Sequence, residues 1–226
     1  MNSVRLTLAG VVHNDPAGPD RLWKFLEDRR PAGVTLEMSL YSLRFRREHR
    51  ERLAGELEAS LERLGGGAAE SPHVRAVRRA IGLPYEYEVI ESWARRRDIS
   101  FELVDMSRVS REHLQHLDEL VSYENLAKLV KAPEVDAAAE AERQRRVATK
   151  LINRVKPLTK KDWPVPRDPE ADERDAAMER RIRRQLERAT GQHWIHVGGW
   201  EHLLWLEDRP TLFSRLKNLN PDRAVV

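Results

Sequence analysis

The chain has 226 residues, with 40 Lys and Arg against 37 Asp and Glu, 40% hydrophobic residues and no cysteine. Its length fits a single domain over residues 1–226 that includes a sizeable insertion, and no apolar run approaches the ~20 residues that a membrane-spanning helix requires. The lack of cysteine excludes disulfides, thiolate metal sites and cysteine nucleophiles, so any metal would need His and carboxylate ligands.

Four apolar, β-branched segments predict the strands of the fold, at residues 4–12, 33–38, 99–104 and 193–197. The first segment runs into a polar turn without a convincing small-residue cleavage site. We therefore expect a strand rather than a signal peptide, and a cytoplasmic protein without membrane insertion. One short helical segment separates the first two strands, and such a crossover favours two parallel strands that are neighbours in the sheet.

Charged segments with helical periodicity fill most of the remaining chain. We predict a helical insertion or cap over about 40–98 and 110–190, in which helices over 110–121 and 168–189 each begin at a capping side chain. The segment 157–169 contains four prolines and should lack regular structure. After the fourth strand we expect a helical tail. These elements predict the α/β class, as a small open, mostly parallel sheet with a helical insertion or cap.

Ionisable side chains stand where the predicted strands end. They are His13, Glu37, Asp105 and, just after the fourth strand, His202. Polar residues commonly end strands, so each one alone carries little weight. The carboxyl ends of parallel strands, however, meet at one edge of the sheet, where open α/β sheets bind ligands. Glu37 is unusual because it follows an apolar run, and a carboxylate there would need a cation, a metal or a hydrogen-bond donor beside it.

A Gly-x-x-His pattern occurs at two strand exits, Gly10–His13 and Gly199–His202. Glycine lets the backbone pass close to a ligand or to the other turn, and histidine offers a neutral imidazole to a metal or a proton. Trp200, inside the second pattern, is expected in a cleft. Asp105 has two interpretations, as the residue that orients one of the histidines or as a cap of the following helix.

Arg174 extends the apolar stripe of the late helix. Met178, Ile182 and Leu186 recur every four residues, and one turn earlier the same face carries Arg174. An arginine on that face needs an acid or an anionic ligand. The acids on either side of Arg174 could instead pair locally within the helix, and the sequence leaves both interpretations open.

Taken in order, Gly10–His13, Glu37 in VTLEMS, Arg174 in Glu-Arg-Asp and Gly199–Leu203 resemble the pattern of the TraB/PrgY pheromone-shutdown family. That family is related to the Tiki metalloproteases and, more distantly, to the ChaN-like and erythromycin-esterase-like proteins. The resemblance spans the chain from the first strand to Leu203, and its middle is matched only by helical character. It implies an α/β core with a helical insertion.

This resemblance implies that His13, Glu37 and His202 are metal ligands or acid/base groups of a metal-dependent hydrolase. Arg174 would orient a carboxylate or polarise a substrate carbonyl. The substrate would be a peptide or a small ester or amide. Zn, Mn, Co or Fe suits two imidazoles and a carboxylate, and such an ion lowers the pKa of bound water to about 7. Arg44 matches an arginine often found after the Glu strand in the family. The candidate substrate-binding residues are Arg44, Asp105 and Trp200.

Two other functions remain open on the sequence. A non-catalytic protein on the same fold could bind a small ligand or peptide and signal. Residues 142–161 hold eight Lys and Arg against one acid and could attract nucleic-acid phosphates. Interleaved aromatic residues are missing there, so a solvated helix face is the favoured explanation. The sequence assigns no oligomeric state.

Overall fold

The computed structural model describes residues 4–165, 169–189 and 191–226. Within these residues one five-stranded sheet has the order β3-β2-β4-β1-β5. All of its strand pairs are parallel, which confirms the predicted α/β fold with an open parallel sheet. The strands are β1 (Arg5–Val11), β2 (Gly33–Leu36), β3 (Phe101–Leu103), β4 (His193–Gly199) and β5 (Asp222–Val225).

The strand order departs from the prediction in two ways. β1 and β2 are parallel but are not neighbours, because β4 pairs with both of them. The expected helical tail also contains β5, which pairs with β1 at the edge of the sheet. β5 has only four residues, and an apolar signal that short does not distinguish a strand from a helix.

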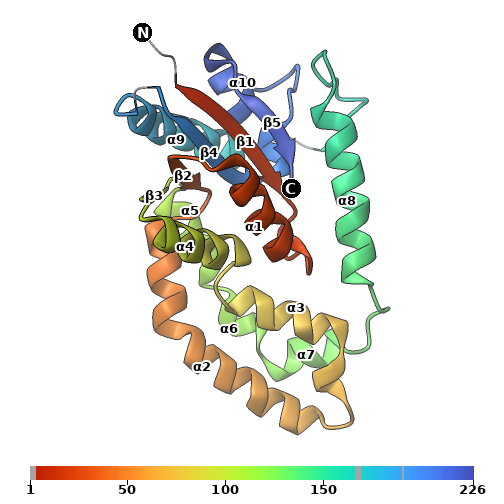
Figure 1. Cartoon of the computed structure of the whole chain (residues 1–226). Coiled ribbons are helices and arrows are strands. Elements are labelled where there is room, and N and C mark those ends of the chain that lie inside the picture. The colour runs from red at the N-terminus through yellow and green to blue at the C-terminus, as the bar shows by residue number, and fades with distance from the viewer. Residues whose placement is uncertain (1–3, 166–168, 190) are drawn as a thin grey trace.

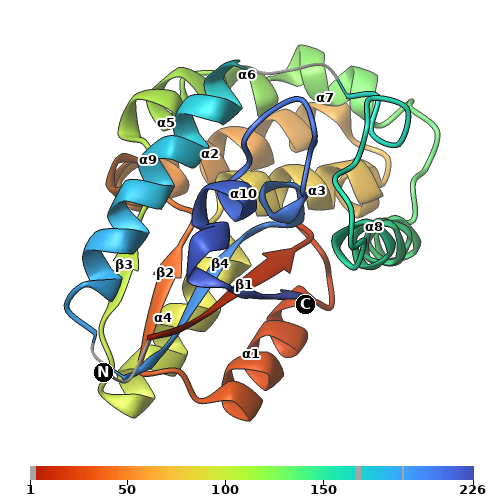
Figure 2. The ribbon, with the colours of Figure 1, turned by 90° about the horizontal axis from the view of Figure 1, so that it is seen from above.

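Helices cover both faces of the sheet (Figures 1 and 2). α1 (Gly18–Arg29) and α4 (Tyr85–Arg97) share a hydrophobic core with β1, β2 and β4 on one face. On the other face the core is built by α8 (Ala137–Ile152), α9 (Pro169–Leu186), α10 (Leu212–Leu216) and the 3₁₀ helix η2 (Trp200–Leu203). The short 3₁₀ helix η3 (Lys217–Leu219) leads from α10 toward β5.

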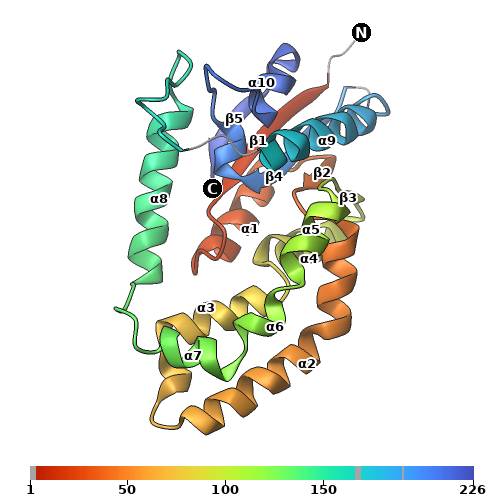
Figure 3. The same ribbon diagram turned by 180° about the vertical axis from the view of Figure 1, so that it is seen from behind.

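A second helical body, the helical lobe, lies beyond the carboxyl ends of the strands (Figures 1 and 3). It has a hydrophobic core of its own, separate from the two cores on the sheet. The lobe covers only part of the predicted insertion, because α4 and α9 pack on the sheet instead. Its elements are α2 (Leu40–Leu64), η1 (Ala68–Glu70), α3 (Pro72–Ile81), α5 (Ser107–Leu114), α6 (Leu117–Leu120) and α7 (Tyr123–Leu129).

Three predicted helix boundaries are corrected. The helix expected over 110–121 begins at Ser107 and breaks into α5 and α6, so Ser110 is not its cap but bonds to Ser39. α9 ends at Leu186 rather than at 189. Its expected capping Asp168 lies outside the described residues. In the part of the chain that the structure describes, every helix is too short or too polar to cross a bilayer.

The proline-rich segment is largely irregular as predicted, over the residues of it that the structure describes. It is nevertheless anchored to the core. Leu158 is buried and forms a parallel bridge with Leu206, and the Trp163 ring packs edge-on against Trp200. The described part of this segment therefore packs against η2 and against the chain that follows it.

Gly10 allows the first Gly-x-x-His turn to approach the second. A Cβ atom at Gly10 would lie 2.8 Å from the Cα of Trp200, closer than real side chains come. We expect Gly10→Ala to lower the free energy of unfolding by about 1–3 kcal/mol through overpacking. A Cβ added at Gly55, on an exposed part of α2, would meet no atom within 4 Å, so Gly55→Ala should raise stability by about 0.5–1 kcal/mol. Urea unfolding of both variants checks these opposite signs.

Candidate active site

His13 follows β1 and is held by a buried carboxylate. Its Nδ1 lies 2.8 Å from Glu86 Oε1, at the start of α4. The His13 side chain is 55% exposed, whereas that of Glu86 is 5% exposed. Burial lowers the pKa of His13, but the hydrogen bond and charge of Glu86 outweigh it, and the pKa is raised above its usual 6.5. The described residues offer no hydrogen-bond partner to its Nε2, which leaves this nitrogen for a ligand.

Glu37, directly after β2, is the centre of the site. Its Oε1 accepts hydrogen bonds from Arg174 Nη2 at 2.6 Å and lies 3.0 Å from His202 Nε2. Its Oε2 accepts the backbone N–H of Gly199 at 2.7 Å. Burial alone would raise the pKa of Glu37, but His202 and Arg174 hold it well below its usual value. The carboxylate that the sequence places in an apolar run is therefore ionised and supplied with donors.

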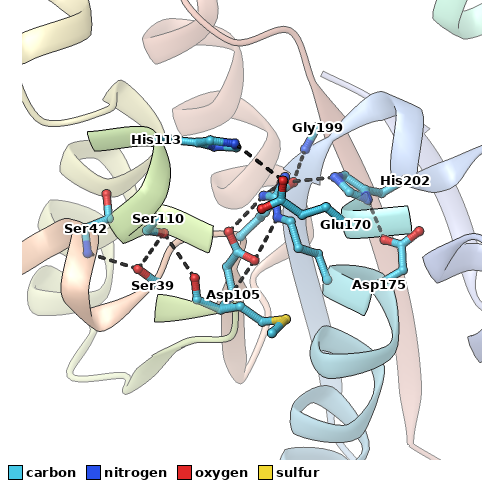
Figure 4. A network of polar contacts seen from close by, with 12 residues as sticks. Ser39, Ser42, Asp105, Ser110, His113, Glu170, Asp175, Gly199 and His202 are labelled. Carbon is cyan, nitrogen blue, oxygen red and sulfur yellow. Dashed lines mark hydrogen bonds and ion pairs between the residues drawn. The ribbon is translucent and has the colours of Figure 1, made fainter. Parts of the chain in front are cut away.

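His202 reaches Glu37 from η2, and its other nitrogen is bound as well. Its Nδ1 bonds to Asp175 of α9, as Figure 4 shows. Burial lowers the pKa of His202, yet the two adjacent carboxylates raise it well above the usual 6.5. His202 is thus an imidazolium at neutral pH, fixed between Glu37 and Asp175. Glu37 lies beside the start of η2 because the register of β2 and β4 pairs Leu36 with Val197.

Arg174 faces the sheet, as the apolar stripe of α9 predicts. Met178 and Ile182 on that stripe are fully buried. The guanidinium binds Asp105 through Nε at 3.1 Å and through Nη2 at 2.8 Å, in addition to its bond with Glu37. Burial opposes its charge, but Glu37 and Asp105 raise the pKa of Arg174 above its usual range. Among the described residues Nη1 has no hydrogen-bond partner, so it can donate to a ligand.

A cavity of about 820 Å³ lies between the sheet edge and the helical lobe. His13, Glu37 and Arg174 line it from the sheet side. Arg46 of α2 and Arg79 of α3 line it from the lobe. His202 is not among its lining residues, so it acts on the cavity through Glu37. Strand ends, helical lobe and α9 therefore converge on one solvent-accessible site, as the parallel sheet requires.

The structure brings together four of the predicted site residues, His13, Glu37, Arg174 and His202, but moves three others away from their expected roles. Arg44 is exposed on α2 and does not line the cavity. Trp200 is 6% exposed and belongs to the hydrophobic core, where its ring packs against Trp163 rather than lining the cavity. Asp105 binds Arg174 rather than a histidine, and its Oδ1 also accepts the backbone N–H of Met106 just before α5.

Sequence reasoning missed the two acids that orient the histidines, Glu86 and Asp175. Glu86 shares the buried face of α4 with Ile90 and Trp93, four and seven residues later. This is the same helical stripe signal that identifies Arg174, and it would have identified Glu86 too. Asp175 was visible only as a neighbour of Arg174, because nothing local shows that His202 binds it.

His196 is a further buried histidine beneath the site. Its Nδ1 bonds to Thr35 Oγ1 at 3.0 Å, and its Nε2 is buried without a partner among the described residues. Gly198 lies between it and Glu37, since a Cβ at Gly198 would be 2.7 Å from Glu37 Oε2 and 3.0 Å from His196 Nε2. Burial lowers the pKa of His196 to about 4.

The buried His196 should make the protein sensitive to mild acid. The unfolded chain takes up a proton near pH 6.5, whereas the folded His196 does so only near pH 4, so stability falls as the pH drops through this window. Relative to His196→Asn, we expect the wild type to lose about 3 kcal/mol between pH 7 and pH 4. Urea unfolding of both proteins at several pH values checks this. Parallel curves would show that His196 does not titrate as described.

The predicted metal site is tested by the surroundings of its three ligands. Both histidines bind a carboxylate through Nδ1, which is the outer arrangement of many metal-bound histidines. Glu37, however, is already neutralised by Arg174 and His202 and accepts the Gly199 N–H. The described residues contain no group of three or more His, Asp or Glu side chains that could hold an ion. As placed, these residues do not fit a metal, and the Zn, Mn, Co or Fe ion stays a prediction.

Comparison with protein-family models, curated proteins and solved structures finds no match to this chain.

The basic segment 142–161 is partly neutralised within the structure. Arg143 pairs with Glu140, Arg145 with Glu142, and Arg154 with Asp162. These pairs agree with a solvated helix face, and the expectation that nucleic acid is not the ligand stays a prediction.

Proposed function

We propose that this chain hydrolyses an ester or amide bond, of a small molecule or a peptide, in the cavity at His13. One observation carries the proposal. A carboxylate-oriented imidazole with an unbound Nε2 and a guanidinium with an unbound Nη1 line the same cavity at the carboxyl edge of a parallel sheet. Together they supply a base and an electrophile, the two groups that attack on a carbonyl requires.

In the proposed reaction, neutral His13 takes a proton from water through Nε2, and Glu86 stabilises the imidazolium that forms. The resulting hydroxide adds to the substrate carbonyl. Arg174 Nη1 donates to the oxygen that becomes negative in the tetrahedral intermediate. His13 then returns the proton to the leaving oxygen or nitrogen as the bond breaks, which restores the neutral base.

Glu37 and His202 have positioning roles in this scheme. Glu37 fixes Arg174 Nη2, and His202 with Asp175 fixes Glu37. The likeness to the TraB/PrgY pattern supports a hydrolytic function. Membership of the TraB/PrgY family is part of the proposal. A metal ion, if bound, would supply an acidic water, but no step above depends on it. A cytoplasmic location likewise stays a prediction.

Hydrolysis by protein purified without chelator tests the proposal. We expect saturable turnover of p-nitrophenyl acetate or of a peptide or amide library, and we expect it to persist after EDTA treatment because the assigned roles belong to protein groups. Loss on EDTA treatment and recovery with Zn, Mn, Co or Fe would instead support the predicted metal. Elemental analysis of wild type, His13→Ala and His202→Ala shows whether an ion depends on these side chains. No turnover on any ester, amide or peptide would contradict the proposal and favour the non-catalytic ligand-binding alternative.

A further inference from the structure

Two arginines of the helical lobe line the cavity and form no ion pair with a carboxylate among the described residues. Arg46 donates through Nη1 to the backbone carbonyls of Ala80 and, at 2.7 Å, of Gly82. Arg79 makes no hydrogen bond or ion pair with any described residue, and its Nε is buried. A guanidinium carries five donors in a planar fork that matches carboxylate and phosphate oxygens. Both residues therefore bring to the cavity a positive charge that forms no ion pair with a carboxylate of the described residues.

The other charges of the cavity are mostly paired. Arg174 binds Glu37 and Asp105, and Glu86 binds His13. Arg78 pairs with Glu58 on the outside of the lobe. The remaining lining acid, Glu88, is exposed on α4. The uncompensated charge on the lobe wall is thus positive.

Both arginines line the cavity that also holds His13, and Arg46 is fixed to the end of α3. The bond from Arg46 to the Ala80 carbonyl places its guanidinium beside the residue that follows Arg79. Arg46 also interacts electrostatically with Glu86, the carboxylate that holds His13. Burial lowers the pKa of Arg46, and the charge of Glu86 offsets only part of the cost of holding this cation away from water. An anion bound here would offset that cost and would lie in the same cavity as His13 and Arg174.

We propose that the substrate carries an anionic group, a carboxylate or a phosphate, and that Arg46 and Arg79 bind it on the lobe wall of the cavity while the scissile carbonyl lies at His13 and Arg174. This inference rests on the proposed function for the position of the carbonyl. The anion site itself rests on the two arginines. Substrates of this class are anionic esters or amides, such as peptides with a nearby free carboxylate.

Calorimetric titration with succinate and with inorganic phosphate tests the anion site without catalysis. We expect one of the two anions to bind wild type and His13→Ala equally. Arg79→Gln should weaken binding roughly tenfold or more, since hydrogen bonds to charged groups are the strong ones. Arg50→Gln, an exposed arginine one turn beyond Arg46 on α2, is the matched control and should bind as wild type does. Failure of both anions to bind, or equal binding by Arg79→Gln and wild type, would overturn the inference.

Paired esters connect the anion site to the reaction. We expect p-nitrophenyl hemisuccinate, which carries a carboxylate, to have at least a tenfold higher kcat/KM than neutral p-nitrophenyl acetate. Arg79→Gln should remove this preference by lowering kcat/KM for the hemisuccinate toward the value for the acetate. Arg46→Gln should also remove the preference for the hemisuccinate. If loss of the bonds to the Ala80 and Gly82 carbonyls unfolds the lobe in this variant, Arg79→Glu serves as the second variant. Anion binding without His13-dependent turnover of either ester would contradict the proposed function but support the anion site. Turnover of both esters with equal kcat/KM would contradict the proposal that the substrate is anionic.

Discussion

Replacing His13 with alanine is expected to lower kcat/KM by about 10²–10⁴, the usual contribution of a positioned general base. His13 is the only described histidine that lines the cavity together with both Glu37 and Arg174 while its Nδ1 is fixed by a carboxylate. The remaining groups would still bind substrate and stabilise the oxyanion, so KM should change less than kcat. Steady-state hydrolysis of the best ester found for the wild type measures the effect.

His116→Ala is the matched control for this variant. Its side chain is 61% exposed, against 55% for His13, and it contacts a nearby acid of its own in α6. It lies outside the cavity lining, so we expect wild-type turnover. Equal turnover by wild type and His13→Ala, with the fold of both verified by circular dichroism, would remove His13 from the reaction.

Replacing Glu37 with glutamine is expected to lower the free energy of unfolding by about 3–5 kcal/mol, the usual loss when one partner of a buried ion pair is removed. The Glu37 side chain is only 5% exposed and is shared by Arg174 and His202. An amide keeps the volume but removes the charge that both cations face. Urea unfolding at pH 7 measures the loss, and Glu88→Gln, an exposed acid of the same cavity, should change stability by less than about 0.5 kcal/mol.

The pH dependence of the same comparison separates charge from packing. Because the folded pKa of Glu37 lies well below its usual 4.5, its ionisation contributes stability that is present above pH 4.5 and is lost as the pH falls through the folded value. The difference between wild type and Glu37→Gln should therefore shrink as the pH falls below 4.5. A difference that does not depend on pH would assign the loss to packing rather than to charge.

The sequence predicts those parts of the site that follow from local pattern plus one rule of topology. Strand ends at His13, Glu37 and Asp105 are readable from apolar runs, and parallel strands bring such ends to one edge. Arg174 is readable because a helical stripe has fixed periodicity, so an ionisable residue on it must meet a partner in the core. Both arguments need only short stretches of chain, and the structure agrees with both.

The order of the strands cannot be obtained in this way. β4 lies between β1 and β2 although more than 150 residues separate β2 from β4 in the chain. Such pairing depends on packing between distant segments, and local pattern does not contain it. The same reason applies to Asp175, whose partner His202 lies on another element. Glu86 is different, because its place on the buried face of α4 was readable.

Trp200 and Arg44 show how sequence neighbourhood misleads. Trp200 stands between Gly199 and His202, but the tight turn of η2 directs successive side chains to different sides, and the large apolar ring takes the core. Arg44 lies two residues before Arg46 on α2. A helix rotates about 200° over two residues, so only one of the two can line the cavity, and it is Arg46.

The pH dependence of kcat/KM in wild type and Glu86→Gln tests the paired base, His13 with Glu86, most directly. Burial lowers the pKa of His13 and Glu86 raises it, with a net value above 6.5, and the base acts only when neutral. We expect wild-type kcat/KM to rise with pH through a pKa above 6.5, and the rise to move to lower pH in Glu86→Gln. The same inflection in both proteins, or a profile without one, would contradict the assignment of His13 and Glu86 as the base.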